Sequence, residues 1–233
     1  MLENAMKTLI KRTARAIGLE IERAPPADGL TDLADRFGSD KGSRLNANMY
    51  SRIYERFFAR LRHRALCIVE IGLLMSDGGE AKGTRAATSA PSLAMWSKYF
   101  PNALIVGFDI DDFSAVSLPR CKTIQGDCSS RDDLARLVQE TNRPIDILID
   151  DASHASHHQQ TALGFLFPHI APGGIFVIED MCWQPPWLEP QDSPKTRDIL
   201  RKAQIGLPIE SPFMLDSTAL RLSFPMQLTH LQS

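Results

Sequence analysis

The stretch that decides the fold covers residues 145–180, IDILIDDASHASHHQQTALGFLFPHIAPGGIFVIED. An apolar run at each end, at 145–149 and at 174–178, predicts a buried strand. Between the two runs apolar residues recur near helical spacing, and residues 171–174 (APGG) predict a break before the second strand. A strand–helix–strand unit of this kind makes its two strands parallel and usually neighbours.

Two carboxylates follow each of these predicted strands. Asp150 and Asp151 follow the first strand, and Glu179 and Asp180 follow the second. Parallel strands end at the same edge of a sheet, where neighbouring backbones are about 4.8 Å apart, so these acids are expected to converge. Four carboxylates so close would repel one another unless a cation or protons intervened. Since His154 follows shortly after Asp151, the first hypothesis is a metal site with a base beside it.

Structural explanations of the same residues stay open. Asp150 or Asp151 could cap the helix that follows, and the two later acids could pair with basic side chains. His154 and His158 share a helix face, but position 155 lacks the glutamate of a zinc-protease helix, so His157 and His158 are interpreted as residues on the helix surface or behind the ligands of the site. Trp183 and Trp187 either line an acceptor pocket or only pack against the neighbouring prolines.

The rest of the chain alternates predicted strands and helices, which predicts a doubly wound, mostly parallel α/β sheet. Glu70, Asp109 and Asp127 close the earlier strands, so every predicted strand ends in an acid. The acid after the second strand of such a fold can accept hydrogen bonds from both ribose hydroxyls, a role that suits Asp109. Gly72 is not followed by the further glycines of a dinucleotide-binding turn, so NAD(P) is disfavoured.

Composition narrows the class of protein. With 233 residues the chain can form one core plus an extension, and we expect an N-terminal helical segment at 1–64 and a catalytic domain at 65–233. A net charge of −2 gives no reason to expect a nucleic-acid partner. The four cysteines form no C-x-x-C pair, which favours reduced thiols and a cytoplasmic location. No apolar run is long enough for a membrane span.

Four further segments carry expectations. Residues 2–17 predict a basic amphipathic helix, which docks on its own domain or, less favoured, contacts a membrane surface. Spacing alone favours a plain connector at 38–42 and a helix from about residue 46 whose tyrosines belong to the core. Residues 73–90 form a polar insert of unassigned role, and residues 220–228 predict one edge strand, so the closing hairpin is expected to be incomplete.

Several motifs resemble those of class I S-adenosylmethionine-dependent methyltransferases, and in particular of the metal-dependent O-methyltransferases that act on macrolide and other natural-product sugars. The strand and turn motifs, together with a loop similar to that family's cofactor-covering loop, span roughly residues 30–185. They are FGSDKG at 37–42, VEIG at 69–72, SLAMWSKYFPN at 92–102, VGFDI at 106–110, QGD at 125–127, IDDASH at 149–154 and PGGIFVIED at 172–180.

The resemblance implies a doubly wound methyltransferase fold and an O-methyltransferase that uses S-adenosylmethionine and Mg²⁺ or Mn²⁺. All-oxygen ligation suits these ions better than Zn²⁺. The resemblance also implies metal ligation by Asp151, Glu179 and Asp180, with His154 as general base and Asp151 also catalytic. The implied cofactor contacts are Glu70, Gly72, Ser92, Asp109, Ile110, Gly126, Asp127 and Asp150.

The implied partner is a small molecule with a sugar or polyketide-like hydroxyl, and we expect a homo-oligomer. The alternative is a non-catalytic S-adenosylmethionine-binding or scaffold protein with a degenerate C-terminus. Metal-linked formation of methylated product separates the two hypotheses.

Overall fold

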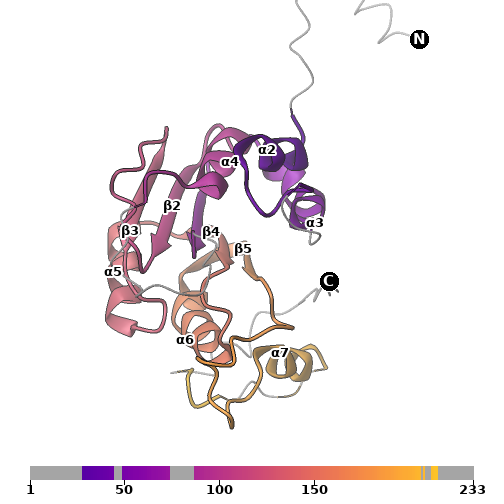
Figure 1. The fold of residues 1–233 in the computed structure, drawn as a ribbon, viewed down its shortest axis with the longest axis vertical. Coiled ribbons are helices and arrows are strands. Elements are labelled where there is room, and N and C mark those ends of the chain that lie inside the picture. Colours follow the sequence, from indigo (N-terminus) through magenta and orange to yellow (C-terminus); the bar gives the residue numbers. More distant parts are fainter. Residues whose placement is uncertain (1–27, 45–48, 74–86, 206, 208–210, 215–233) are drawn as a thin grey trace, which may run out of the picture.

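A single parallel sheet organises the molecule (Figure 1). The computed structural model describes residues 28–44, 49–73, 87–205, 207 and 211–214. Within them the strand order is β3-β2-β1-β4-β5, and every neighbouring pair is parallel. The predicted doubly wound α/β fold is confirmed. The strands are β1 (Cys67–Ile71), β2 (Leu104–Asp109), β3 (Cys121–Gln125), β4 (Ile145–Asp150) and β5 (Ile170–Ile178).

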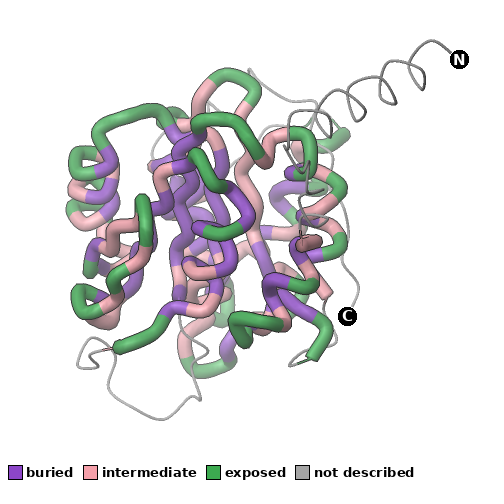
Figure 2. Tube along the Cα trace, turned by 90° about the horizontal axis from the view of Figure 1, so that it is seen from above, coloured by how far each residue is buried: buried purple, intermediate pink, exposed green. Residues whose placement is uncertain are grey.

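Helices cover both faces of the sheet because successive strand residues point to opposite sides. Ile68 belongs to the core cluster with α2, α3 and α4, whereas Val69 belongs to the cluster with α5 and α6. The buried residues therefore run through the middle of the molecule, and exposed residues form its outside (Figure 2). These helices are α2 (Leu30–Phe37), α3 (Tyr50–Phe58), α4 (Pro91–Tyr99), α5 (Arg131–Thr141) and α6 (Ser156–Leu166), with short 3₁₀ turns at Ala59–Leu61 and Phe167–His169.

The last strand begins earlier than predicted. Ile145 pairs with Ile170, and the register then shifts before Ile147 pairs with Ile175. Residues 171–174, expected as a break between helix and strand, therefore form an irregularity inside β5. Gly173, with φ of 77°, adopts the left-handed backbone that glycine tolerates there.

The sequence interpretation missed helix α7 (Thr196–Gln204), which packs beside α6. Ile199 and Leu200 are buried against Leu163 and Met214. The segment is only nine residues long and mostly polar, and although its apolar residues share one face, no element was predicted there.

Some expectations fall on residues outside the described part of the chain. They are the amphipathic helix at 2–17, most of the polar insert (74–86) and the edge strand at 220–228. Among the described residues, none of the helices has the length and apolar character needed to cross a bilayer.

Candidate active site

The carboxyl ends of β1, β4 and β5 meet at one place. Ile71 pairs with Asp150, which pairs in turn with Ile178, so the acids that follow these strands lie side by side. The backbone continues the pairing, because Asp151 N donates to Ile71 O at 2.8 Å and Glu179 N donates to Asp150 O at 2.9 Å. The predicted convergence of acids from two neighbouring strands is confirmed.

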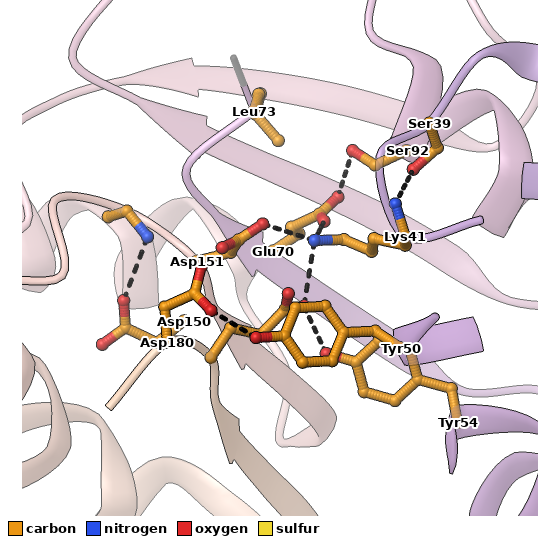
Figure 3. A network of polar contacts seen from close by, with 12 residues as sticks. Ser39, Lys41, Tyr50, Tyr54, Glu70, Leu73, Ser92, Asp150, Asp151 and Asp180 are labelled. Carbon is orange, nitrogen blue, oxygen red and sulfur yellow. Dashed lines mark hydrogen bonds and ion pairs between the residues drawn. The ribbon is translucent and has the colours of Figure 1, made fainter. Parts of the chain in front are cut away.

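A buried lysine from the N-terminal segment occupies the centre of these acids (Figure 3). Lys41 is 1% exposed, and its Nζ donates to Glu179 Oε1 at 2.9 Å and to the carboxylate of Asp151. The same Nζ lies 3.5 Å from Glu70 Oε1. One ammonium group thus bridges carboxylates from the ends of three strands. The sequence analysis treated the segment around Lys41 as a connector or a cofactor cover and did not assign this contact.

Two tyrosines of α3 complete the network. Tyr54 OH donates to Glu179, and Tyr50 OH, one turn earlier, donates to Asp180. Both rings lie in the core, as expected from their helical spacing, but their hydroxyl groups point at the acids (Figure 3). Tyrosine in place of phenylalanine at these core positions was the sequence feature that pointed to such contacts, because a buried hydroxyl group needs a hydrogen-bond partner.

Electrostatics in this cluster are set by burial. Burial raises the pKa of Asp151 and of Glu179, while the ammonium of Lys41 opposes the rise at both carboxyls. For Lys41 itself burial acts to lower the pKa, but the surrounding carboxylates outweigh it and hold the pKa well above its usual range. Burial raises the pKa of Glu70 to about 7. The cluster is therefore an interdependent set of buried charges.

A second group of potential ligand atoms lies beside this network. Atoms of Asp151, His154 and Asp180 all lie within 4.8 Å of one another, which is compatible with one metal ion. Nε2 of His154 is 3.8 Å from Asp180 Oδ2, and Nδ1 of His154 is buried without a hydrogen-bond partner among the described residues. Glu179, expected as a ligand, is not a member of this group. Its Oε1 is engaged by Lys41 and Tyr54.

These residues fit a hard divalent cation. Two carboxylates and an imidazole converge from two loops, and Mg²⁺ and Mn²⁺ prefer carboxylate oxygens of this kind. His154 and Asp180 both have left-handed backbones, with φ of 58° and 50°. Such strain in residues other than glycine is characteristic of functional sites.

The predicted cofactor residues line the neighbouring strand ends. Gly72 has φ of 86°, and a Cβ atom there would lie 2.2 Å from the carbonyl oxygen of Asp151, so only glycine fits. Asp109 accepts hydrogen bonds from Leu73 N at 2.7 Å and Asp111 N at 2.8 Å. Asp127 Oδ1 accepts from both N and Oγ of Ser129.

Other predicted cofactor residues are engaged by protein groups. Glu70 is fully buried, and its Oε2 accepts from Ser92 Oγ at 2.7 Å and Trp96 Nε1 at 3.1 Å. Ile110 O accepts from the side-chain amide of Gln125, and Gly126 N donates to the carbonyl of Asp109 at the end of β2. The contacts of these residues with a cofactor stay predictions.

Among the described residues, Asp150 is the buried acid whose carboxylate has the fewest hydrogen bonds. It is 3% exposed, its Oδ1 accepts weakly from Ala152 N at 3.4 Å, and its Oδ2 has no hydrogen-bond partner in the described structure. Burial raises its pKa to about 7. Because the unfolded carboxyl titrates near 4, stability is expected to fall as the pH rises from about 4 through 7.

Asp150→Asn is therefore expected to stabilise the protein at pH 8 by about 1–3 kcal/mol and to have little effect at pH 4.5. The asparagine oxygen can keep the contact with Ala152, and no buried charge has to form. Urea denaturation of both proteins at the two pH values measures the difference. Equal denaturation midpoints at pH 8 would contradict the predicted burial cost of the carboxylate.

His157 and His158 lie on the first turn of α6. His158 Nδ1 is 2.8 Å from Ser153 Oγ, and His157 Nδ1 is 4.0 Å from Glu189 Oε2. Neither belongs to the group of potential metal ligands. Both are half-buried, and the ring of His157 lies 4.1 Å from that of His158 and 5.7 Å from that of Phe213, so they are less exposed than plain helix-surface residues.

Sequence comparison finds relatives among enzymes of sugar methylation. The chain is 42% identical over 153 residues to 8-demethyl-8-alpha-L-rhamnosyl tetracenomycin-C 2'-O-methyltransferase of Streptomyces olivaceus. The aligned region covers 66% of this chain and 38% of that relative. It is 37% identical over 158 residues to mycinamicin VI 2''-O-methyltransferase of Micromonospora griseorubida, covering 68% and 37% of the two chains. The chain therefore spans less than two fifths of these relatives' length. No family model matches the chain.

Comparison with solved structures also finds a methyltransferase. The fold matches the MycE methyltransferase of the mycinamycin biosynthetic pathway, solved in complex with Mg, S-adenosylhomocysteine and mycinamycin VI, with a TM-score of 0.63 and 31% identity. The match covers 77% of this chain and 49% of that one. Over the two thirds of its length that align with these sequences, the chain is a homologue of natural-product sugar O-methyltransferases and has their Rossmann-like methyltransferase fold.

Proposed function

We propose that this chain transfers a methyl group from S-adenosylmethionine to a hydroxyl group of a sugar-bearing small molecule, with the help of Mg²⁺ or Mn²⁺. The observation that carries the proposal is the convergence of Asp151, His154 and Asp180 at the carboxyl edge of the sheet, beside the glycine turn at Gly72. Open α/β folds bind their ligands at this edge. The named activities of the relatives support the same reaction class.

In this proposal Asp151 and Asp180 hold the divalent ion, while Glu179, the third expected ligand, lies outside the group and is held by Lys41 and Tyr54. When bound, the ion would lower the pKa of an acceptor hydroxyl and fix its line of attack on the sulfonium methyl of the donor. His154 takes the hydroxyl proton at Nε2, the ring nitrogen that faces Asp180 at 3.8 Å. The carboxylate of Asp180 then stabilises the imidazolium that forms.

The donor would occupy the ends of β1 and β2. Gly72 has no side chain and so allows a close approach to the backbone, and Asp109 is the expected partner of the ribose hydroxyls. Asp127 is the expected partner of the adenine amine, with Gly126 directly before it, and Ile110 directly follows Asp109. Glu70 and Ser92, which are joined by a hydrogen bond, are the expected neighbours of the methionine part of the donor.

We also propose that the chain consists of an N-terminal segment at 1–64 and a catalytic domain at 65–233, and that both contribute to the site. Helices α2 and α3 pack in the same core cluster as the sheet, and Lys41 reaches the acids. The described part of the N-terminal segment therefore contributes to the site. A polyketide-like aglycone, a homo-oligomeric state and a cytoplasmic location stay predictions.

Removal of divalent metal is the direct test. With S-adenosylmethionine, Mg²⁺ and a panel of rhamnosylated polyketides, the purified chain is expected to form S-adenosylhomocysteine and a product heavier by one methylene group. EDTA should lower the rate at least about tenfold, and added Mg²⁺ or Mn²⁺ should restore it. Mass spectrometry of both products measures the reaction.

Matched aspartate variants provide the control. Asp151→Asn should lose metal-dependent turnover, whereas Asp192→Asn, a change at an exposed aspartate outside the site, should not. Binding of S-adenosylmethionine without any methylated product across the panel would favour the alternative, a non-catalytic cofactor-binding protein.

A further inference from the structure

Two exposed tryptophans stand next to the candidate site. Trp183 is 51% exposed and Trp187 is 71% exposed, although tryptophan is normally well buried. Their ring centroids lie 6.2 Å apart with the planes inclined at 68°. Trp183 also makes an edge contact with the ring of His154, at 5.7 Å between centroids. The indole pair is thus continuous with the group formed by Asp151, His154 and Asp180.

The loop that carries both tryptophans leaves β5 and leads to α7 (Figure 1), and it is fixed at both ends. Trp183 N donates to Asp180 O at 3.0 Å, directly after the candidate ligand. At the other end, the N–H groups of Leu188 and Glu189 both donate to Pro185 O. The loop therefore has a defined internal geometry.

The side chain of Glu189 ties this loop to the rest of the domain. Its carboxylate accepts from Ser156 N, at the start of α6, and from Lys195 Nζ, both at 2.7 Å. The same loop thus holds exposed aromatic surface against the helix that begins just after His154. The loop conformation that these hydrogen bonds stabilise therefore keeps both indoles exposed.

We propose that Trp183 and Trp187 form the subsite for the pyranose ring of the acceptor, an inference that rests on the proposed function. A pyranose has a face of C–H bonds that packs on an indole, while its hydroxyl groups point outward around the ring. Two indoles inclined to each other form a corner against which the ring can lie. From there a ring hydroxyl is directed toward His154, which contacts Trp183.

The chemistry of this surface selects a sugar over other occupants. Beside the indoles, the side chains of His154 and Asp180 are 19% and 33% exposed, so the aromatic area borders polar groups that can hydrogen-bond to hydroxyl groups. A purely apolar partner would bury these groups without hydrogen-bonding to them, which carries a cost. A second copy of the chain, or another protein segment, is an alternative occupant that the experiment separates.

The test uses the full chain with Mg²⁺, S-adenosylhomocysteine and methyl α-L-rhamnopyranoside as the probe. Saturation-transfer NMR is expected to show the C–H protons of one pyranose face receiving magnetisation from the protein. Trp183→Ala and Trp187→Ala should each reduce this signal by about tenfold, and Trp187→Phe should retain most of it. Ile205→Ala, at another exposed apolar residue, is the matched control.

Turnover of a rhamnosylated acceptor gives the second measurement. Trp187→Ala is expected to raise KM about tenfold with little change in kcat, because it removes binding and not proton transfer. Unchanged KM and unchanged saturation transfer in both alanine variants would overturn the subsite, and so would a change confined to the oligomeric state measured by light scattering. Saturation transfer that depends on the tryptophans without any methyl transfer would support the subsite and refute the proposed reaction.

Discussion

Lys41→Met is expected to lower the free energy of unfolding by about 3–5 kcal/mol at neutral pH, because it removes the only cation that bonds to Asp151 and Glu179 in the described structure. Methionine fills a similar volume, so little of the loss comes from packing. What remains is a group of buried carboxylates without a counter-ion, and burial already raises the pKa of each.

The sign of the pH dependence follows from these pKa values. Without Lys41 the carboxyls of Asp151 and Glu179 are expected to bind protons more tightly in the folded than in the unfolded protein. Such groups stabilise the fold below their unfolded pKa, and this contribution is lost as the pH rises through the folded pKa. The deficit of Lys41→Met should therefore be small near pH 4 and grow toward pH 8.

Urea denaturation midpoints across this pH range measure the effect. Lys98→Met, a change at an exposed lysine of α4, is the matched control and should stay within about 0.5 kcal/mol of the parent protein. A midpoint for Lys41→Met equal to that of the control at pH 8 would mean that the ammonium contributes no net stability.

The fixed position of Lys41 has a local cause that sequence periodicity does not record. Asp35 accepts hydrogen bonds from Ser43 N at 2.6 Å and Arg44 N at 3.1 Å, which folds the chain back after α2. Ser51 N then donates to Lys41 O at 2.9 Å and fastens the turn to α3. These are side-chain and backbone contacts between polar residues, and a pattern of apolar residues carries no information about them.

Strand ends were predictable because they depend on simple rules. Apolar runs that stop on acids, together with the parallel pairing imposed by a strand–helix–strand unit, were enough to bring Asp151 and Glu179 together. The resemblance to methyltransferases added proposed roles to these residues. The partner that neutralises the two acids comes from a segment more than a hundred residues earlier, and sequence order alone does not indicate such a contact.

The set of candidate metal ligands, Asp151, His154 and Asp180, was likewise only partly predictable from the sequence. Asp180 and Asp151 lie together as expected, but the orientation of Glu179 depends on Lys41 and Tyr54, which the sequence analysis placed in a connector and in the core. His154 enters the group because of its left-handed backbone, with φ of 58°. A left-handed backbone is uncommon at any single residue other than glycine, so a pattern of apolar residues does not show which residue adopts it.

His154→Gln is expected to lower kcat by about 10²–10⁴-fold while leaving the dissociation constant for Mn²⁺ within about twofold. This outcome follows if the imidazole removes the hydroxyl proton and oxygen atoms hold the ion, as Mg²⁺ and Mn²⁺ prefer. Because His154 lies within 4.8 Å of both Asp151 and Asp180, the same geometry would also allow its nitrogen to ligate the ion. The two measurements together separate these roles, since loss of a ligand weakens Mn²⁺ binding and loss of a base does not.

Electron paramagnetic resonance of free Mn²⁺ gives the dissociation constant, and single-turnover methyl transfer gives the rate of the chemical step. His63→Gln, a change at an exposed histidine outside the candidate site, is the matched control and should alter neither value. A parallel fall in Mn²⁺ affinity and rate for His154→Gln would assign the imidazole to the metal and require another group to accept the proton. Normal affinity with a slow chemical step would assign the proton to His154, because the ion and the donor would then be bound and only the transfer of the hydroxyl proton would be lost.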